Sequence, residues 1–204
     1  MPLVDFNDPA LWDGGPTSLY RDGFGRGYVR EAKETYIGDD AQRLREALDI
    51  KPGQSIILVG AAFGWMAEDW EDAGLGPIVA LDTSRWILDR LEHAARPIIN
   101  EDIGNHAAVT KALGKTRATW CISEDLIAAL SDDEAVALAK RMRPMAEHVV
   151  HWTSCGIRRG PNPMEGVEGE WAGDPRLNWK TLEDWKELLA PDTVVARNEM
   201  GRVL

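Results

Sequence analysis

Apolar residues follow two alternating patterns along this chain. Short, fully apolar runs are typical of strands buried on both faces of a sheet, and apolar residues three or four positions apart are typical of helices with one buried face. The runs predict strands at 55–59, 78–81, 97–100, 118–122, 149–153 and 193–196. The spaced pattern predicts helices at 39–48, 65–73, 84–95, 105–113, 131–143 and 182–190.

This alternation of strand and helix predicts one α/β architecture. Successive βαβ units give a Rossmann-like, doubly wound, mostly parallel sheet with helices on both faces. Right-handed crossovers place the ligand crevice at the carboxyl ends of the strands.

The first 38 residues are punctuated by glycine and proline and carry many aromatic side chains. A solvated tail has no need of so many aromatics, so we expect residues 1–38 to form an N-terminal cap on a main domain of residues 39–204. Four cap side chains are candidates for the mouth of a substrate site: Tyr20, Arg21, Arg26 and Tyr28. Such a segment also suits the simpler task of covering a sheet edge. The Gly/Pro-rich stretch 155–177 is predicted to be a long functional loop.

The most informative motif is the run Gly-Ala-Ala-Phe-Gly at 60–64, between a strand and a helix. Small residues let the backbone approach a ligand closely, and the helix N-terminus offers free N–H groups. Asp82 follows at the end of the second strand, where a carboxylate can accept both hydroxyls of a ribose. The turn, the spacing and the acid together favour a nucleotide site over a tight turn with a surface aspartate.

Two common nucleotide sites are disfavoured. A dinucleotide fingerprint counted from Gly60 requires a third glycine at position 65, where this chain has Trp65. The Gly-Lys-Ser/Thr ending of a phosphate-binding P-loop is absent as well.

Between about residues 53 and 155, the chain resembles the class I S-adenosylmethionine-dependent methyltransferases, with looser similarity to the C-terminus. The run 60–64 looks like that family's glycine loop, Asp82 looks like its ribose-binding acid, and Asp102 is similar in position to the acid beside the adenine. The most specific part of the match is the fourth strand, capped helix and fifth strand, within residues 121–151. The resemblance implies that S-adenosylmethionine is the cofactor, held by Gly60, Ala61, Ala62, Phe63, Gly64, Asp82, Thr83, Asp102, Ile103 and Ser123.

The chain departs from the family pattern at two positions. Leu58 stands where the family usually has an acid, which removes a polar anchor near the amino acid end of the cofactor. Ala62 replaces the middle glycine of the loop, and alanine fits there if its φ is negative.

Methyl transfer from a sulfonium depends mainly on alignment of the acceptor with the methyl group, and a base is needed only when the acceptor loses a proton. Glu124 and Asp125, which follow the fourth strand, are candidates to orient an amine or to take that proton. Their simpler role is to stabilise the dipole of the following helix. His151 is a further candidate base, although a histidine in a strand more often belongs to the core.

Composition narrows the partners and the setting. The net charge of −11 disfavours nucleic acid and anionic membranes, and no amino-methylating Asn/Asp-Pro-Pro-Tyr/Trp motif is present, which leaves a small-molecule or protein methyl acceptor. Two cysteines without a Cys/His cluster argue against zinc. The opening residues lack a signal-peptide pattern and no apolar run is long enough for a membrane span, so we expect a cytoplasmic protein. The sequence does not determine the oligomeric state.

Three functions therefore compete. The leading one is an S-adenosylmethionine-dependent methyltransferase. The departures at Leu58 and Ala62 favour a non-catalytic binding or assembly protein that kept the fold. The third is an NAD-dependent oxidoreductase, against which Trp65 argues.

Overall fold

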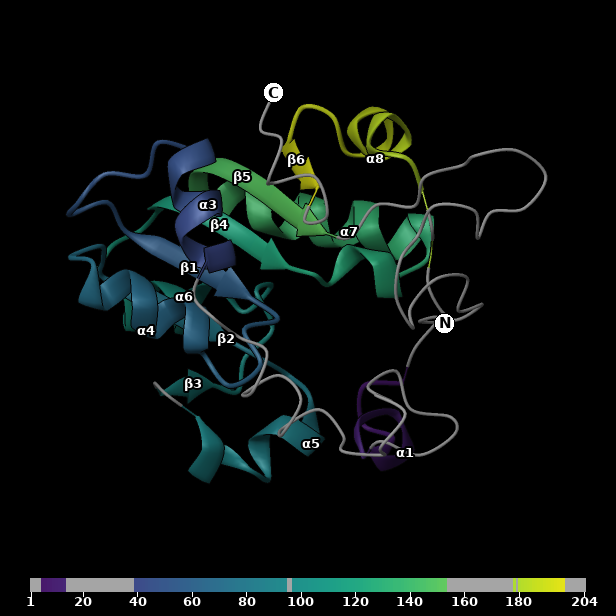
Figure 1. The fold of residues 1–204 in the computed structure, drawn as a ribbon, viewed down its shortest axis with the longest axis horizontal. Coiled ribbons are helices and arrows are strands. Elements are labelled where there is room, and N and C mark those ends of the chain that lie inside the picture. Colours follow the sequence, from purple (N-terminus) through teal and green to yellow (C-terminus); the bar gives the residue numbers. More distant parts are fainter. Residues whose placement is uncertain (1–4, 14–38, 95–96, 154–177, 179, 197–204) are drawn as a thin grey trace.

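A computed structural model of the protein describes residues 5–13, 39–94, 97–153, 178 and 180–196. Six strands form one sheet in the order β3-β2-β1-β4-β5-β6, and every neighbouring pair is parallel (Figure 1). The strands are β1 (Ile56–Val59), β2 (Ile78–Leu81), β3 (Ile98–Ile99), β4 (Ala118–Glu124), β5 (Ala146–Thr153) and β6 (Thr193–Ala196). The predicted doubly wound α/β fold is confirmed.

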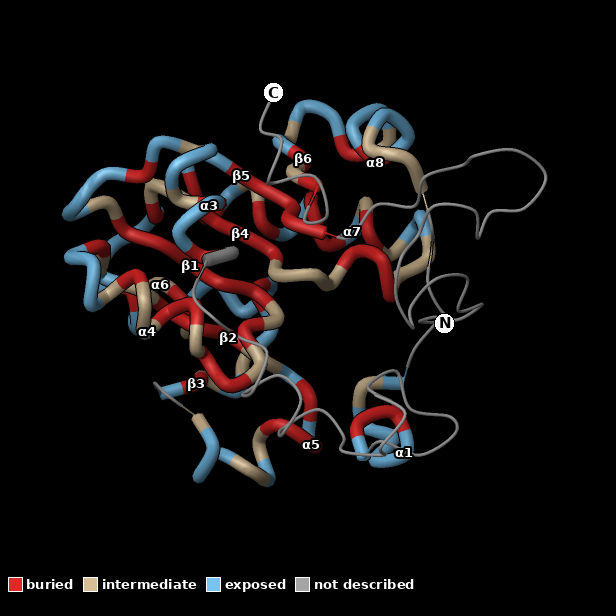
Figure 2. The backbone as a smooth tube through the Cα atoms, viewed as in Figure 1, coloured by how far each residue is buried: buried red, intermediate tan, exposed pale blue. Residues whose placement is uncertain are grey.

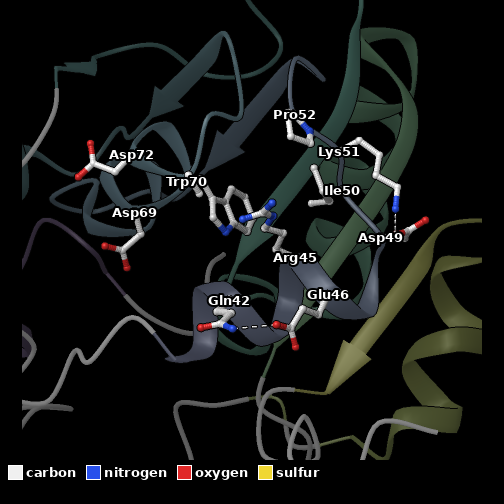
Figure 3. A pocket seen from close by; sticks show the side chains of 11 residues that line it. Gln42, Arg45, Glu46, Asp49, Ile50, Lys51, Pro52, Asp69, Trp70 and Asp72 are labelled. Atoms are coloured by element: carbon white, nitrogen blue, oxygen red, sulfur yellow. Dashed lines mark hydrogen bonds and ion pairs between the residues drawn. The ribbon is translucent and has the colours of Figure 1, made fainter.

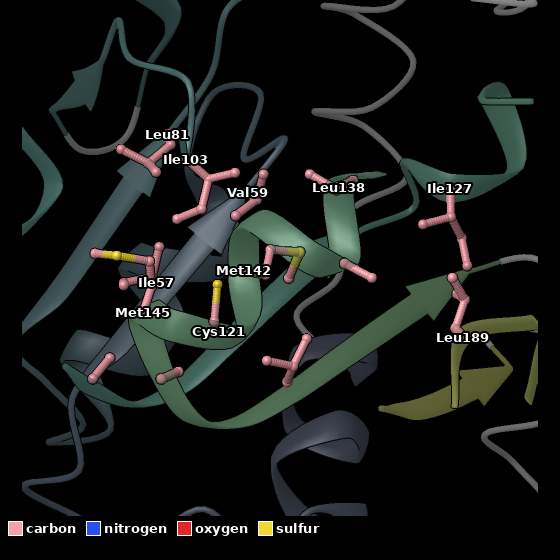
Figure 4. Packing of buried hydrophobic residues seen from close by; sticks show 14 of the residues in the cluster. Ile57, Val59, Leu81, Ile103, Cys121, Ile127, Leu138, Met142, Met145 and Leu189 are labelled. Atoms are coloured by element: carbon pink, nitrogen blue, oxygen red, sulfur yellow. The ribbon is translucent and has the colours of Figure 1, made fainter. Parts of the chain in front are cut away.

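Helices cover both faces of this sheet, because successive side chains of a strand point to opposite faces. The α-helices are α1 (Pro9–Trp12), α3 (Asp39–Ala47), α4 (Trp65–Asp72), α5 (Arg85–Leu88), α6 (His106–Leu113), α7 (Asp132–Met142) and α8 (Leu182–Leu189). Ile57 and Val59 pack with α6, α7 and α8 in one core cluster (Figure 4). Ile56 and Leu58 pack with α3 and α4 in the other. All four residues of β1 are buried, so this strand lies in the middle of the core (Figure 2).

The order of the strands reverses between β1 and β4. β1 pairs with β2 on one side and with β4 on the other, and Val59 aligns with both Leu81 and Ser123. Helices leave the sheet toward opposite faces at such a point, which opens a crevice beyond the carboxyl ends of the strands. The turn after β1 and the end of β4 are therefore neighbours at the carboxyl-end edge of the sheet, where such a crevice is expected.

The predicted elements agree with the structure except for their lengths. The helix expected over 84–95 is confined to α5, followed by the short 3-10 turn Leu91–His93. Arg90 interrupts it: its φ is −131°, and its guanidinium donates a hydrogen bond to the Trp86 carbonyl at 3.2 Å. The third strand has two residues only, whereas β4 extends to Glu124 and so includes two residues that were expected beyond the strand.

The described part of the N-terminal segment packs against the main domain. Helix α1 begins after Asp8, whose side chain accepts the amide hydrogen of Ala10, and it lies beside α5 (Figure 1). The other residues of the predicted cap, including its candidate side chains at 20, 21, 26 and 28, lie outside the described residues, as does the predicted loop at 155–177. No helix among the described residues is long and apolar enough to cross a membrane.

Candidate functional site

The turn after β1 has an unusual backbone. Gly60, Ala62 and Gly64 have φ values of 75°, 48° and 73°, so alternate residues of the turn are left-handed. The amides of Gly60 and Ala61 both donate to the carbonyl of Leu81 at 3.0 Å, and these bonds fix the start of the turn against β2. The condition under which alanine fits at position 62, a negative φ, is not met. Ala62 holds a conformation that costs an L-residue free energy, and such strain concentrates at functional sites.

Asp82 lies directly beside this turn. Its Oδ2 accepts the amide hydrogen of Ala62 at 2.9 Å, and its Oδ1 accepts that of Ser84 at 2.8 Å. Burial raises the pKa of Asp82 above its ordinary value, although the hydrogen bonds from the amides of Ser84, Ala62 and Thr83 act in the opposite direction. The carboxylate at the end of β2 is thus joined to the glycine loop, and Thr83 is exposed beside it.

The two candidates after β3 have different surroundings. Ile103 is buried in the core cluster of α6 and α7. Asp102 is exposed, and both its carboxylate oxygens accept hydrogen bonds from Arg141 at 2.9 Å. Its Oδ1 also accepts the amide hydrogen of Gly104 at 2.6 Å. No local pattern indicates Arg141 as the partner of Asp102, because the two residues lie 39 positions apart.

The end of β4 lies against the glycine loop. A Cβ atom built on Gly60 would lie 3.5 Å from the carbonyl oxygen of Glu124 and 3.4 Å from a methyl carbon of Leu126. Asp125 follows with a left-handed φ of 46°, and its amide donates to the Trp152 carbonyl at 2.8 Å. Glu124 and Asp125 are therefore at the same edge as Asp82, and two non-glycine residues with positive φ, Ala62 and Asp125, follow neighbouring strands.

Ser123 and His151 are both fully buried and contact each other. Ser123 Oγ lies 2.9 Å from Nδ1 of His151, while Nε2 of the same ring lies 3.3 Å from Oδ2 of Asp192. The Arg143 guanidinium donates to the other oxygen of Asp192 at 2.9 Å. Sequence analysis missed Asp192 and Arg143. Asp192 reaches His151 because it directly precedes β6, in which Val194 aligns with His151 of β5, and Arg143 directly follows α7. A ring with both nitrogens engaged in the core is better suited to support Ser123 than to touch an acceptor.

Burial alone would raise the pKa of Asp192. Its hydrogen bonds and charge interactions with His151 and Arg143 outweigh that effect and hold the pKa of Asp192 below the ordinary value. The network thus keeps Asp192 ionised, with a cation at its surface side and an imidazole at its buried side.

A separate cavity of about 560 Å³ lies at the other end of the sheet (Figure 3). It is lined by the end of α3, the end of α4 and the turn before β1, including Arg45, Lys51, Asp69 and Trp70. Three of its charged groups have partners close in sequence: Glu46 contacts Gln42, and Lys51 contacts Asp49. Since β1 enters the sheet there, this cavity is remote from the glycine loop. Among the described residues, no three His, Cys, Asp or Glu side chains gather to hold a metal ion.

No family model matches this sequence, and no curated protein sequence matches it. Solved structures do. Magnesium protoporphyrin IX methyltransferase from Synechocystis, with bound S-adenosylmethionine, has a TM-score of 0.53 at 13% identity over 91% of this chain and 84% of that one. A Bacillus halodurans protein provisionally described as a methyltransferase has a TM-score of 0.50 at 13% identity over 74% and 67%.

A third similar structure, from Haloferax volcanii, is a complex of a methyltransferase activator with a protein provisionally described as a methyltransferase. Its TM-score is 0.50 at 10% identity, over 79% of this chain and 72% of that one. Three further solved methyltransferases are longer: this chain spans only about half of each, 53%, 50% and 51% of their lengths. These likenesses are likenesses of fold. The chain has the fold of the class I S-adenosylmethionine-dependent methyltransferases.

Proposed function

We propose that this chain binds S-adenosylmethionine at the carboxyl ends of β1 and β2 and transfers its methyl group to a small-molecule or protein acceptor. The observation that carries the proposal is the contact between Asp82 and the glycine loop, at 2.9 Å from the amide of Ala62. In α/β sheets, a carboxylate at the end of a strand binds the ribose of a nucleotide. The tight turn beside it lets the backbone lie close to the rest of the ligand. The Synechocystis enzyme, solved with bound S-adenosylmethionine, supports the same use of the fold.

The residues present fit this cofactor. The amides of Ala62, Ser84 and Thr83 occupy three acceptor positions of the Asp82 carboxylate, and of its roughly four positions one remains for a ribose hydroxyl. The glycine loop allows close approach of the backbone, and α4 begins directly after Gly64, which has no side chain to cap the helix. We propose that Thr83, Ile103 and Asp102 lie along the same cofactor. For Asp102 this requires that Arg141 share or release its carboxylate.

When bound, the cofactor would supply an electrophilic methyl group on a sulfonium. The chain itself then has to orient an acceptor and, where needed, take a proton from it. Glu124 and Asp125 are the carboxylates at the end of β4, next to Gly60, and we assign them to the acceptor. His151 is assigned a supporting role, since its ring is buried between Ser123 and Asp192.

The charge of the chain supports the choice of acceptor. A net charge of −11 repels a phosphate backbone, so a small molecule or a protein side chain is the acceptor class we propose. NAD is disfavoured because Trp65, and not glycine, begins α4.

A non-catalytic binding protein is the second candidate. Leu58 favours it, because this residue is fully buried in β1 and leaves no carboxylate at the position where the family has one. A turnover experiment separates the two. The protein is incubated with methyl-labelled S-adenosylmethionine and fractionated metabolites or proteins, and formation of S-adenosylhomocysteine is measured for wild type and for Glu124→Gln. Turnover that falls in the variant supports the enzyme, whereas cofactor binding without turnover on any fraction supports the binding protein.

A further inference from the structure

We propose that residues 5–13 form a clasp that holds the Asp82 carboxylate in its binding position, and that Ser84 is the positioning residue between them. The inference rests on the proposed function, in which Asp82 binds the ribose. If it holds, cofactor affinity depends also on residues 5–13, which lie outside the glycine loop and the strand ends.

The clasp is bonded to the residues that directly follow Asp82. The hydroxyl of Ser84 donates to the carbonyl of Phe6 at 2.7 Å, and the amide of Arg85 donates to Oδ1 of Asn7 at 2.8 Å. The indole N–H of Trp86 donates to Asp13 at 3.2 Å. Three consecutive residues thus bond to the N-terminal segment, although more than 70 positions separate the partners in sequence.

Ser84 serves both sides of this contact. Its hydroxyl bonds to the clasp, while its amide donates to Oδ1 of Asp82 at 2.8 Å. The other oxygen of Asp82 then accepts the amide hydrogen of Ala62. An unbroken chain of hydrogen bonds therefore leads from the clasp through Ser84 and Asp82 to the glycine loop, and displacement of Ser84 would turn the carboxylate away from its position.

Apolar packing follows the same route. Trp12 stacks on Trp86 with ring centroids 5.2 Å apart and an interplanar angle of 17°, and Trp86 in turn lies 6.2 Å from Phe63 of the glycine loop. Phe6 and Ala62 pack against this same cluster. A helix as short as α1 is unstable alone, so its position depends on these contacts. The clasp and the glycine loop therefore share one small core, separate from the two large ones.

A clasp that stabilises the binding conformation must itself be stabilised by the ligand, because coupling between two sites is reciprocal. This separates a positioning role from a merely structural one. In the structural case, loss of a clasp contact lowers the melting temperature and leaves the affinity of the folded protein unchanged.

The test uses S-adenosylhomocysteine as probe and isothermal titration calorimetry of the full chain. Asn7→Ala removes the acceptor for the Arg85 amide from an exposed residue, whereas Asn7→Asp retains an oxygen there. Ser84→Ala and Ser84→Thr form a second pair, in which threonine keeps the hydroxyl. Thr181→Ala is the matched control, because Thr181 caps α8 through a bond to the Asp184 amide, far from the clasp.

We expect Asn7→Ala and Ser84→Ala to bind about three- to tenfold more weakly, the effect of one net hydrogen bond. Asn7→Asp, Ser84→Thr and Thr181→Ala should bind within about twofold of wild type. Hydrogen exchange gives an independent readout. The ligand should slow exchange in the segment 5–13 of wild type, and this protection should shrink in Asn7→Ala.

Wild-type affinity in both alanine variants, with their fold intact, would overturn the clasp and leave the proposed function standing. If Ser84→Ala fails to fold, Asn7→Ala decides alone. Absence of binding by the wild type would overturn the proposed function and the clasp with it.

Discussion

The carboxylate of Asp82 accepts the amide hydrogen of Ala62 at 2.9 Å, which joins the end of β2 to the glycine loop after β1. Ala62, which donates this bond, has a left-handed φ of 48°, so the bond holds the loop in a conformation that an L-residue rarely adopts. The acid therefore has two functions in our account: it shapes the loop, and it binds the ribose. Both can be measured.

Asp82→Ala should weaken binding of S-adenosylmethionine by about 1.5–3 kcal/mol, the typical cost of losing hydrogen bonds to a charged group. The measurement is a calorimetric titration, with Asp89→Ala as control because Asp89 is an exposed acid at the end of α5. Equal affinity of Asp82→Ala and wild type, with the fold retained, would mean that Asp82 only shapes the loop.

Cofactor affinity should fall on acidification at a higher pH than for an ordinary aspartate. Burial raises the pKa of Asp82, so its carboxylate takes up a proton earlier as the pH falls, and the protonated acid accepts fewer hydrogen bonds. Affinity is full above this pKa and is lost as the pH falls through it. Titrations between about pH 7 and pH 4 measure the effect against the ordinary value of about 3.9. Asp82→Asn should remove this dependence, and the same acid-induced loss in that variant would assign it to another group.

Ala62→Gly should stabilise the protein. A left-handed L-residue destabilises the folded state by about 1–2 kcal/mol, and glycine removes this cost. Glycine also gives the unfolded chain more conformational freedom, which reduces the gain in stability by about 0.4–1 kcal/mol. The expected net gain is about 0.5–1 kcal/mol in the free energy of unfolding, measured with urea. Ala61→Gly is the control, since Ala61 is buried without a positive φ and should lose about 1 kcal/mol. A loss of stability in both variants would show that Ala62 is not strained.

Asp192→Asn should destabilise the protein at neutral pH by about 1–3 kcal/mol, because His151 and Arg143 lose their ionised partner. The pKa of Asp192 is lower in the folded state than in the unfolded chain. Its contribution to the free energy of unfolding is therefore complete above the pKa of the unfolded chain, about 3.9, and is lost as the pH falls through the pKa of the folded state. The difference from wild type should therefore shrink below about pH 4. Urea unfolding at several pH values tests this, with the exposed Glu147→Gln on β5 as control. A difference that stays constant down to pH 3 would contradict the assignment.

Glu124→Gln and Asp125→Asn distinguish catalysis from capping. If either acid takes a proton from the acceptor, its amide variant should keep cofactor affinity and lose about 10²–10⁴-fold in turnover. Asparagine tolerates the left-handed φ of Asp125, so the backbone there should be preserved. Unchanged turnover in both variants, with a stability loss of a few tenths to about 1 kcal/mol, would leave them as helix-end acids.

Local patterns in the sequence were sufficient for the strands, the helices and the glycine loop. The apolar run at 56–59 reads as a buried strand without reference to the rest of the chain, and Ser131 and Glu134 mark the start of α7. The amide and the hydroxyl of Ser131 both bond to Glu134 Oε2, at 3.1 Å and 2.6 Å. These signals lie within a few residues of one another, so they can be recognised without knowledge of the tertiary structure.

The partners of the polar side chains could not be predicted in the same way. The contacts between Asp102 and Arg141 and between His151 and Asp192 join residues about 40 positions apart, and nothing in either segment indicates the other. The positive φ of Ala62 is not a conformation that its own residue type favours, and its partner Asp82 lies 20 positions away. The break after α5 likewise involves Arg90, which leaves the helical conformation with a φ of −131° and whose guanidinium lies 4.2 Å from the centroid of the Trp86 ring.

Binding of S-adenosylmethionine is the central claim, and a calorimetric titration of the wild-type chain with S-adenosylmethionine and with NAD tests it most directly. We predict saturable binding of S-adenosylmethionine with one site per chain, competition by S-adenosylhomocysteine, and no binding of NAD at the same concentrations. No binding of S-adenosylmethionine at millimolar concentration, with the chain folded, would contradict the account. Binding of NAD instead would show that the glycine loop and Asp82 form a dinucleotide site.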